Sequence, residues 1–402
     1  MNRRELISGS LVGTTASYLG SLQVMGAEEE IIYVSIEAGA DTNPGTKQSP
    51  LKILSAAAKR VNEGKGTGPT TIILAEGIYA LDQTVKIKSG RSYTKAERLT
   101  IRAESIPDDT DWGLTRMPVL IPTMPLSKDW NGRPDPFDGV AYGMQLETSH
   151  ATVQGIRMCG MPIIEHPKAG SIHRLHGIGR AERTLEDLEV KQCLFTGDEV
   201  TNPNHLALLI NGNGLVVDHC LFYGAKQTVV FWTPGSTGHA MRNCLVWGSY
   251  ATAIWTSGVA NDLDYRNNIV SNSLYVWIGQ GARSAQAEMD QIGRGRVGGP
   301  PAGGPPSGGS PPNRTSAGPV PPESHYNVRN CLFAGNKKFT GSGAGPALNF
   351  QDNDPSLLNL IDTKITEQPV QLELDQTKRN YLHVLEGALG SDLGAGLFVK
   401  KA

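Results

Sequence analysis

The 402-residue sequence predicts an all-β solenoid, a parallel β-helix in which short strands stack coil upon coil. Three observations support this prediction. One motif recurs along the chain, its copies lie about two dozen residues apart, and each copy carries a cysteine or an asparagine at the same place. Repeats of this kind are typical of solenoids, because one unit buries its apolar face only against the next unit.

The motif reads apolar, two polar, Cys or Asn, two apolar, small, then Gly or Asn. Its fourth positions, the ladder positions, lie at intervals of 27, 24, 24 and 63 residues. A coil this short accommodates three short strands with their turns, but no long helix. Because stacked strands lie ~4.8 Å apart, we expect the ladder residues to form one internal column with structural, unpaired cysteines. The ladder residues are Cys193, Cys220, Cys244, Asn268 and Cys331.

The repeats resemble the right-handed parallel β-helix (pectin-lyase-like) superfamily of exported polysaccharide-active proteins. Residues 39–50, GADTNPGTKQSP, are similar to the opening segment of many exported members. The resemblance implies that the helical pattern at 51–61 forms a helix that covers the N-terminal end of the stack. We expect Ser49 to be its N-cap, Pro50 its first residue and Gly64 its end. The superfamily includes lyases, hydrolases, epimerases and adhesins, so the fold does not fix the activity.

Three segments interrupt or flank the predicted β-helix domain, which covers 31–402. Residues 1–27, with Arg3 and Arg4 before a weakly apolar stretch, are expected to be a twin-arginine-like (Tat) export signal. The Gly/Pro-rich insertion at 284–324 cannot bury a core, which predicts disorder. Residues 351–402 are interpreted as an irregular C-terminal cap. We therefore expect a periplasmic, extracellular or cell-surface protein.

Composition excludes some classes of protein. Charged residues make up 19% of the chain and the formal net charge is −2, which argues against a nucleic-acid binder. No run after the signal reaches the ~18 apolar residues of a membrane span. We expect a monomer whose partner is a polysaccharide.

Aromatic residues indicate a surface for sugars. Aligning successive coils on their glycines gives Trp232, Trp255 and Trp277 equivalent positions. If the apolar residue before each tryptophan points inward, alternation points all three indoles outward in one row. Together with Tyr250, this row would bind carbohydrate, since an exposed apolar strip commonly marks a binding site. The alternative is that loops cover the tryptophans.

A row of charged residues stands two positions before the ladder residues and is expected to face solvent. Arg242 beside Arg266 is an unfavourable like-charge pair unless an anion or an acidic side chain lies between them. An acidic sugar would serve, and a solvated charge ladder is the competing interpretation. The row consists of Lys191, Asp218, Arg242, Arg266 and Arg329.

Candidate catalytic residues follow from what β-elimination requires. A lyase acting on an acidic glycan needs a base for the proton next to the carboxyl group and a cation for the resulting charge. Lys226 is the candidate base, Arg242 the candidate cation and His239 a further candidate. Asp198 and Glu199 form a tentative calcium site.

Two other functions remain open at this point. One is a non-catalytic glycan-binding or cell-surface β-helix protein. The other is a glycoside hydrolase, which needs two carboxylates ~5–9.5 Å apart. The segment 165–180 is dense in His and Arg, matches no closed zinc signature, and is interpreted as a loop packed on the side of the solenoid.

Overall fold

The structure is a computed structural model that describes residues 29–126, 140–163, 174–280, 325–342, 351–352 and 357–399. The expected export signal at 1–27 and the expected disordered insertion at 284–324 lie outside the described residues. Within the described part, no helix is both long and apolar enough to cross a membrane.

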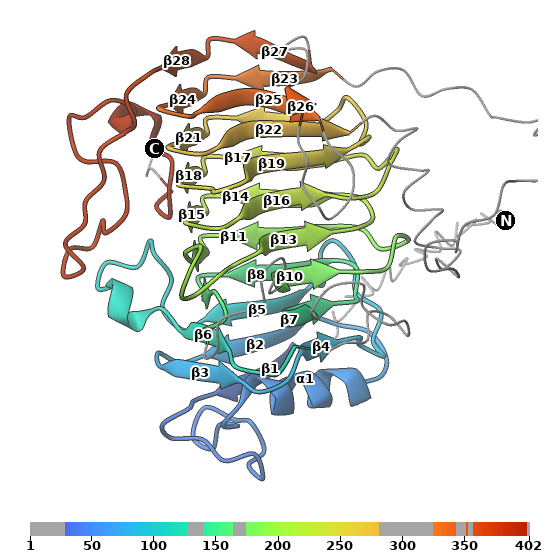
Figure 1. Cartoon of the computed structure of the whole chain (residues 1–402). Helices are drawn as coiled ribbons and strands as arrows, with labels where there is room; N and C mark the ends of the chain where they lie inside the picture. Colours follow the sequence, from blue (N-terminus) through green and yellow to red (C-terminus); the bar gives the residue numbers. More distant parts are fainter. Residues whose placement is uncertain are drawn as a thin grey trace, which may run out of the picture.

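The described strands stack into three sheets, and successive coils add one strand to each sheet (Figure 1). The first sheet contains β1 (Glu30–Val34), β2 (Thr70–Leu74), β5 (Leu99–Ala103), β8 (Ala151–Gln154), β11 (Leu188–Lys191), β14 (Leu215–Asp218), β17 (Ala240–Arg242), β20 (Asp264–Arg266), β23 (Tyr326–Arg329) and β27 (Leu358–Ile361).

The second sheet contains β3 (Ile78–Leu81), β6 (Val119–Pro122), β9 (Arg157–Cys159), β12 (Leu194–Thr196), β15 (Leu221–Tyr223), β18 (Leu245–Trp247), β21 (Ile269–Ser271), β24 (Leu332–Ala334) and β28 (Lys364–Thr366). The third contains β4 (Val85–Ile87), β7 (Val140–Leu146), β10 (Arg174–Arg180), β13 (Leu206–Ile210), β16 (Gln227–Phe231), β19 (Thr252–Ser257), β22 (Tyr275–Gln280), β25 (Lys338–Ser342) and β26 (Gln351–Asp352). All described strand pairings within these sheets are parallel except β25 with β26.

The ladder column is confirmed. The backbone N–H of Cys220 donates to the Sγ of Cys244 over 3.5 Å, and that of Cys244 donates to the Oδ1 of Asn268 over 2.9 Å. The N–H of Asn268 in turn donates to the Sγ of Cys331 over 3.3 Å. All five cysteines are free and buried, and the four in the ladder fill the central core as small apolar side chains. The predicted fold, a right-handed parallel β-helix, is therefore correct.

A second, unpredicted ladder lies one residue earlier, in the bend between the first and second sheets. The residue before each ladder position has a positive φ, for example 55° at Asn243 and Asn267 and 49° at Asn330, and asparagine tolerates this conformation better than most residues. The amide of Asn330 donates to Asn267, that of Asn267 to Asn243, and that of Asn243 to Asp218, over 2.9–3.0 Å. These side chains tie four successive coils together.

The C-terminal region is more than a cap. Strands β27 and β28 add another coil, so the repeat continues within 351–402. The following segment then runs along the side of the stack (Figure 1). There Val370, Leu382, Ala395 and Leu397 pack on the outward residues of five successive second-sheet strands, β12 to β24. These outward residues are Leu194, Leu221, Leu245, Ile269 and Leu332, and the next residue in each strand faces the central core.

Helix α1 (Leu54–Glu63) covers the N-terminal end of the stack with Leu54, Ala58 and Val61 among its buried residues (Figure 1). The capping helix and its end at Gly64 are as predicted, but Ser49 is not the N-cap. Leu51 N–H donates to the Tyr33 carbonyl, so the chain is still strand-like there. The carboxylate of Asp41 instead accepts the N–H groups of residues 52 and 53, just before the helix.

We predict that Asn268→Ala destabilises the protein by about 1–3 kcal/mol. Asn268 is fully buried, and its amide also donates to the Met241 carbonyl over 2.8 Å, so truncation leaves buried groups in neighbouring coils without partners. Urea unfolding measures the loss. The control is Asn359→Ala, which removes an exposed amide hydrogen bond. Equal losses of unfolding free energy in the two variants would contradict the role of Asn268 in holding neighbouring coils together.

Candidate functional site

The outer face of the third sheet is set by a break in strand alternation. The pairing passes from His176–Leu206 to Ile178–Leu208 and omits residues 177 and 207. The same omission recurs in the following coils at 228, 253 and 276. Ala207 and Leu208 both lie in the central core, while the residues on either side of this pair face outward. Two consecutive residues therefore point inward at the same place in successive coils. This repeated break in alternation changes which residues of each strand face outward.

This irregularity changes the predicted tryptophan row. Trp255 faces outward but is buried, and it pairs with Val230, so the predicted equivalence of Trp232 and Trp255 was wrong. The half-buried Trp232 packs edge-to-face against Trp255 with ring centroids 5.5 Å apart. Trp277 pairs with Ile254, is completely buried, and donates its Nε1–H to the Oγ1 of Thr256 over 3.0 Å. An outward Trp277 was wrong, because the glycine alignment is one residue out of register and both residues 276 and 277 point inward.

The early coils place a histidine cluster on the same outer face. His176 of β10 contacts the ring of Tyr142 at 4.8 Å and that of His205 at 6.3 Å. Burial, reinforced by the charge of Arg174, lowers the pKa of His176 to about 3, so this imidazole is neutral. Its Nδ1 has no hydrogen-bond partner in the described part of the chain. Residues 174–180, part of the segment expected to be a loop, form strand β10 instead. The two glycines in this strand interrupt the alternating pattern by which a strand is recognised in the sequence.

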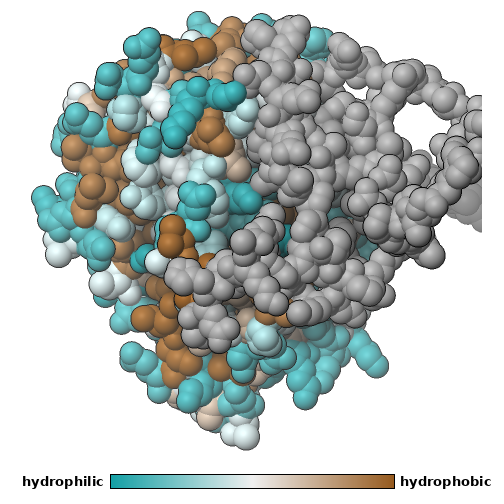
Figure 2. All heavy atoms as spheres, viewed as in Figure 1, coloured by the Kyte–Doolittle hydropathy of each residue, from teal (hydrophilic) through white to brown (hydrophobic). Residues whose placement is uncertain are grey.

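The outer face is basic and aromatic. From β4 to β25 the strands of this sheet contain no Asp or Glu. Farther along the stack, the Lys338 ammonium lies 5.6 Å from the centre of the Tyr275 ring. In the view of Figure 2, hydrophobic residues occur in separate groups among hydrophilic ones on the described part of the surface. Most outward residues of these strands, including Val230, Trp255 and Ile278, are buried, whereas Tyr142 and Trp232 are half-buried and Lys338 is exposed.

Lys226 and Tyr250 lie at one edge of this face, in successive turns between the second and third sheets. The N–H groups of Lys226 and Gln227 donate to the carbonyls of Asn204 and His205 in the preceding coil. Burial lowers the pKa of the half-buried Lys226, against the opposing charge of Glu199. Burial and the same carboxylate raise the pKa of Tyr250. The structure thus brings the predicted base close to Tyr250 and Glu199.

The other two candidate catalytic residues lie elsewhere. His239 is buried in the turn between the third and first sheets; its Nδ1 accepts the Leu215 N–H, and its Nε2 lies 2.8 Å from the Oγ of Ser236. Arg242 is on β17 of the first sheet. Lys226, His239 and Arg242 therefore do not converge, because they occupy different sides of the coil.

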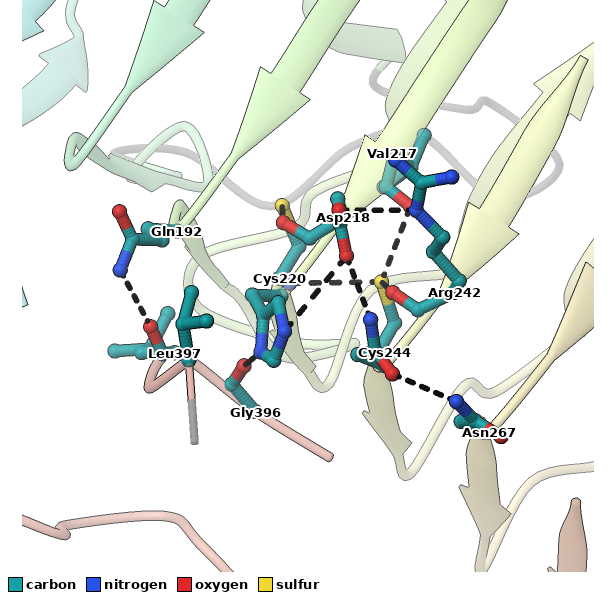
Figure 3. A network of polar contacts seen from close by, with 12 residues as sticks. Gln192, Val217, Asp218, Cys220, Arg242, Cys244, Asn267, Gly396 and Leu397 are labelled. Atoms are coloured by element: carbon teal, nitrogen blue, oxygen red, sulfur yellow. Dashed lines mark hydrogen bonds and ion pairs between the residues drawn. The ribbon is translucent and has the colours of Figure 1, made fainter. Parts of the chain in front are cut away.

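The charged row follows the predicted register from Lys191 to Arg329. Arg242 Nε lies 3.0 Å from Asp218 Oδ2 (Figure 3). Asp264 Oδ2 lies 3.9 Å from Arg242 Nη1 and 3.4 Å from Arg266 Nη2. An acidic side chain thus separates Arg242 from Arg266, one of the two arrangements that the sequence allowed.

The tentative calcium ligands have a local role. Asp198 Oδ1 accepts the N–H groups of Val200 and Thr201, and Oδ2 accepts the Thr201 hydroxyl over 2.7 Å. Burial opposes ionisation of Asp198, but these hydrogen bonds outweigh it and lower its pKa. Glu199 is exposed. Among the described residues, no group of three or more His, Cys, Asp or Glu side chains is placed to hold a metal ion.

We predict that His239 makes stability depend on pH. Burial, with a contribution from Arg180, lowers its folded-state pKa to about 4 from the ordinary 6.5, with Asp262 opposing. As the pH falls from 6.5 to 4, only the unfolded chain gains this proton, so stability present above pH 6.5 is lost. The free energy of unfolding that His239 can contribute in this way is at most about 3 kcal/mol. Urea unfolding at about pH 7.5 and about pH 5 measures how much the free energy of unfolding falls on acidification. This fall should be about 2 kcal/mol smaller in His239→Gln than in the wild type. An equal fall in both proteins would refute the assignment.

No known protein family matches the chain, and no curated protein matches its sequence. Among solved structures it is similar to a rhamnogalacturonan lyase, at 11% identity and a TM-score of 0.47 over 92% of this chain and 100% of that one. It is also similar to pectin methylesterase PemA from Erwinia chrysanthemi, at 10% identity and a TM-score of 0.46 over 88% and 93%.

A GH136 lacto-N-biosidase from Eubacterium ramulus aligns at 10% identity and a TM-score of 0.43, over 84% of this chain and 55% of that one. The chain thus spans about half the length of that enzyme. Identities this low concern the fold alone. With three parallel sheets, an internal ladder and a helix over the N-terminal end, the chain is a right-handed parallel β-helix protein.

Proposed function

We propose that the protein binds an acidic polysaccharide along the outer face of the third sheet. The observation that carries this proposal is the combination of aromatic and basic side chains with strands that lack carboxylates from β4 to β25. A solenoid presents similar backbone positions at every coil, so a linear polymer meets a regular surface. Positive charge on that surface favours an anionic chain over a neutral one.

Aromatic side chains near the beginning and the middle of the face support a sugar ligand. Trp232 is half-buried and lies against Trp255, whereas Tyr142 is half-buried near His176. Rings of this kind combine a large apolar area with a polar edge, which suits ligands that have both. The proposal includes export through the signal at 1–27, action in the periplasm, outside the cell or at its surface, and a monomeric state.

We predict that Trp232→Ala weakens binding to a uronic-acid polymer by about tenfold, equivalent to ~1.4 kcal/mol. The substitution removes an indole that is accessible on the proposed face. Isothermal titration or affinity electrophoresis measures the change. Trp247→Ala is the matched control, because this half-buried tryptophan lies on the second sheet and stacks on Tyr223. Comparable weakening in both variants, with both folded, would argue against the third-sheet face.

A second candidate function is β-elimination at the edge of the same face, with Lys226 as the base. An amine accepts a proton only when neutral, and burial lowers the pKa of Lys226 in the direction that favours this form. Lys226 would take the proton next to the sugar carboxylate, and the glycosidic oxygen would leave as the double bond forms. Hydrolysis by paired carboxylates has less support, since Asp218 and Asp264 are engaged with arginines.

We predict that Lys226→Gln abolishes release of unsaturated product from uronic-acid polymers, if the wild-type protein cleaves them, while binding falls less than tenfold. In the wild type, activity should rise with pH as the amine loses its proton. Absorbance of the unsaturated product measures both effects. Lys191→Gln on the first sheet is the control. A wild-type protein that binds these polymers without cleaving them would contradict β-elimination and leave binding as the function.

A further inference from the structure

The charged row on the outer face of the first sheet is electrostatically uneven. Near its beginning, Lys191 Nζ lies 3.3 Å from Glu189 Oε2, and Arg242 is paired with Asp218. Each cation there has a carboxylate of its own. Such partly exposed pairs contribute little stability, but they leave that part of the surface without net charge.

The later coils lack this balance. Arg266 and Arg329 are direct neighbours in the register of β20 and β23, and both are exposed. The carboxylate of Asp264 is shared between Arg242 and Arg266. Arg329 forms no ion pair with any described residue. The carboxylates of Asp218 and Asp264 thus pair with Arg242 and Arg266, and the charge of Arg329 has no carboxylate partner among the described residues.

An amide group adds a hydrogen-bond donor beside these arginines. Asn327 is two residues before Arg329 on β23, so its side chain is on the same outer face. Its Oδ1 accepts a hydrogen bond from the amide of Asn359 over 2.8 Å. That contact turns the acceptor of Asn327 toward β27, and its own Nδ2 donates to no described residue. The exposed guanidinium groups of Arg266 and Arg329 and the amide nitrogen of Asn327 thus lie on neighbouring strands, with Asp264 paired to Arg266.

We propose that Arg266, Arg329 and Asn327 form an anion site for a carboxylate or sulfate group of an acidic glycan. Like charges on adjacent strands are unfavourable, and a bridging anion removes that cost. Guanidinium groups bind planar oxyanions through paired hydrogen bonds. Because the excess is a single charge and Asp264 stands beside it, the site suits a monoanionic substituent such as a uronate carboxylate or a sulfate ester.

This site is on a different sheet from the proposed polysaccharide-binding face, and its existence does not require that face. A glycan chain held there would attach the protein to an acidic matrix through the first sheet. The two sites are separable by mutation, because Trp232 and Arg329 belong to different sides of the solenoid.

The test uses the full-length protein and three polymers: polygalacturonate, dextran sulfate and neutral dextran. Arg266→Gln/Arg329→Gln should weaken binding to one or both anionic polymers by about tenfold and make the remaining binding less sensitive to salt. Neutral dextran should show no response to the substitution. Lys52→Gln, which removes an exposed cation near the N-terminal end, is the control and should bind like the wild type.

The arms also distinguish the source of the anion. Loss confined to polygalacturonate assigns a carboxylate ligand, and loss confined to dextran sulfate assigns a sulfate. The same loss in a Trp232→Ala background shows that the site acts independently of the third sheet. The proposal is overturned if the double variant binds both anionic polymers as the wild type does, or if Lys52→Gln weakens them equally.

Discussion

Stacking in register is the constraint on which the rest of the molecule depends. Each coil exposes backbone donors and acceptors along its edge, and only an adjacent coil with the same register satisfies them. Asn268 reinforces this contact, since its amide bonds to Cys244 N–H and to the Met241 carbonyl of the preceding coil. Because the register is fixed, equivalent side chains form columns along the axis. A type of side chain that recurs at one position of the coil is therefore presented along a whole face.

The three faces consequently differ in what they can bind. The second sheet's outward leucines and isoleucine are buried under the C-terminal segment. In the bend that leads into this sheet, Gln192 also donates to the Leu397 carbonyl (Figure 3). His219, in the equivalent bend of the next coil, hydrogen-bonds to the Gly396 carbonyl. That side is therefore occupied by the chain itself. The first sheet presents charges, and the third leaves Tyr142 and Trp232 half-buried and Lys338 exposed, so the proposed ligand sites are on these two sheets.

Sequence reasoning succeeded where the same residue types recur at equivalent positions of successive coils. Cys193, Cys220 and Cys244 repeat with their flanking residues, so the column and the charged row beside it could be placed before any coordinates. It failed where position depends on a local interruption. The omitted residue in each third-sheet strand is not marked by one residue type, being glycine at 177, alanine at 207 and threonine at 228. Trp277 was consequently assigned to the wrong side.

The candidate catalytic residues illustrate a limit of reading chemistry from spacing. His239 and Arg242 are three residues apart, yet the imidazole is held by Ser236 and the Leu215 N–H inside the fold while the guanidinium faces solvent beside Asp218. In a solenoid, residues a few positions apart point to different sides, whereas residues a whole coil apart are neighbours. Lys226 and Tyr250, separated by one coil, satisfy that condition. A site in this fold is therefore sought along the axis, among equivalent turns, and Lys226 is the predicted catalytic residue that meets this requirement.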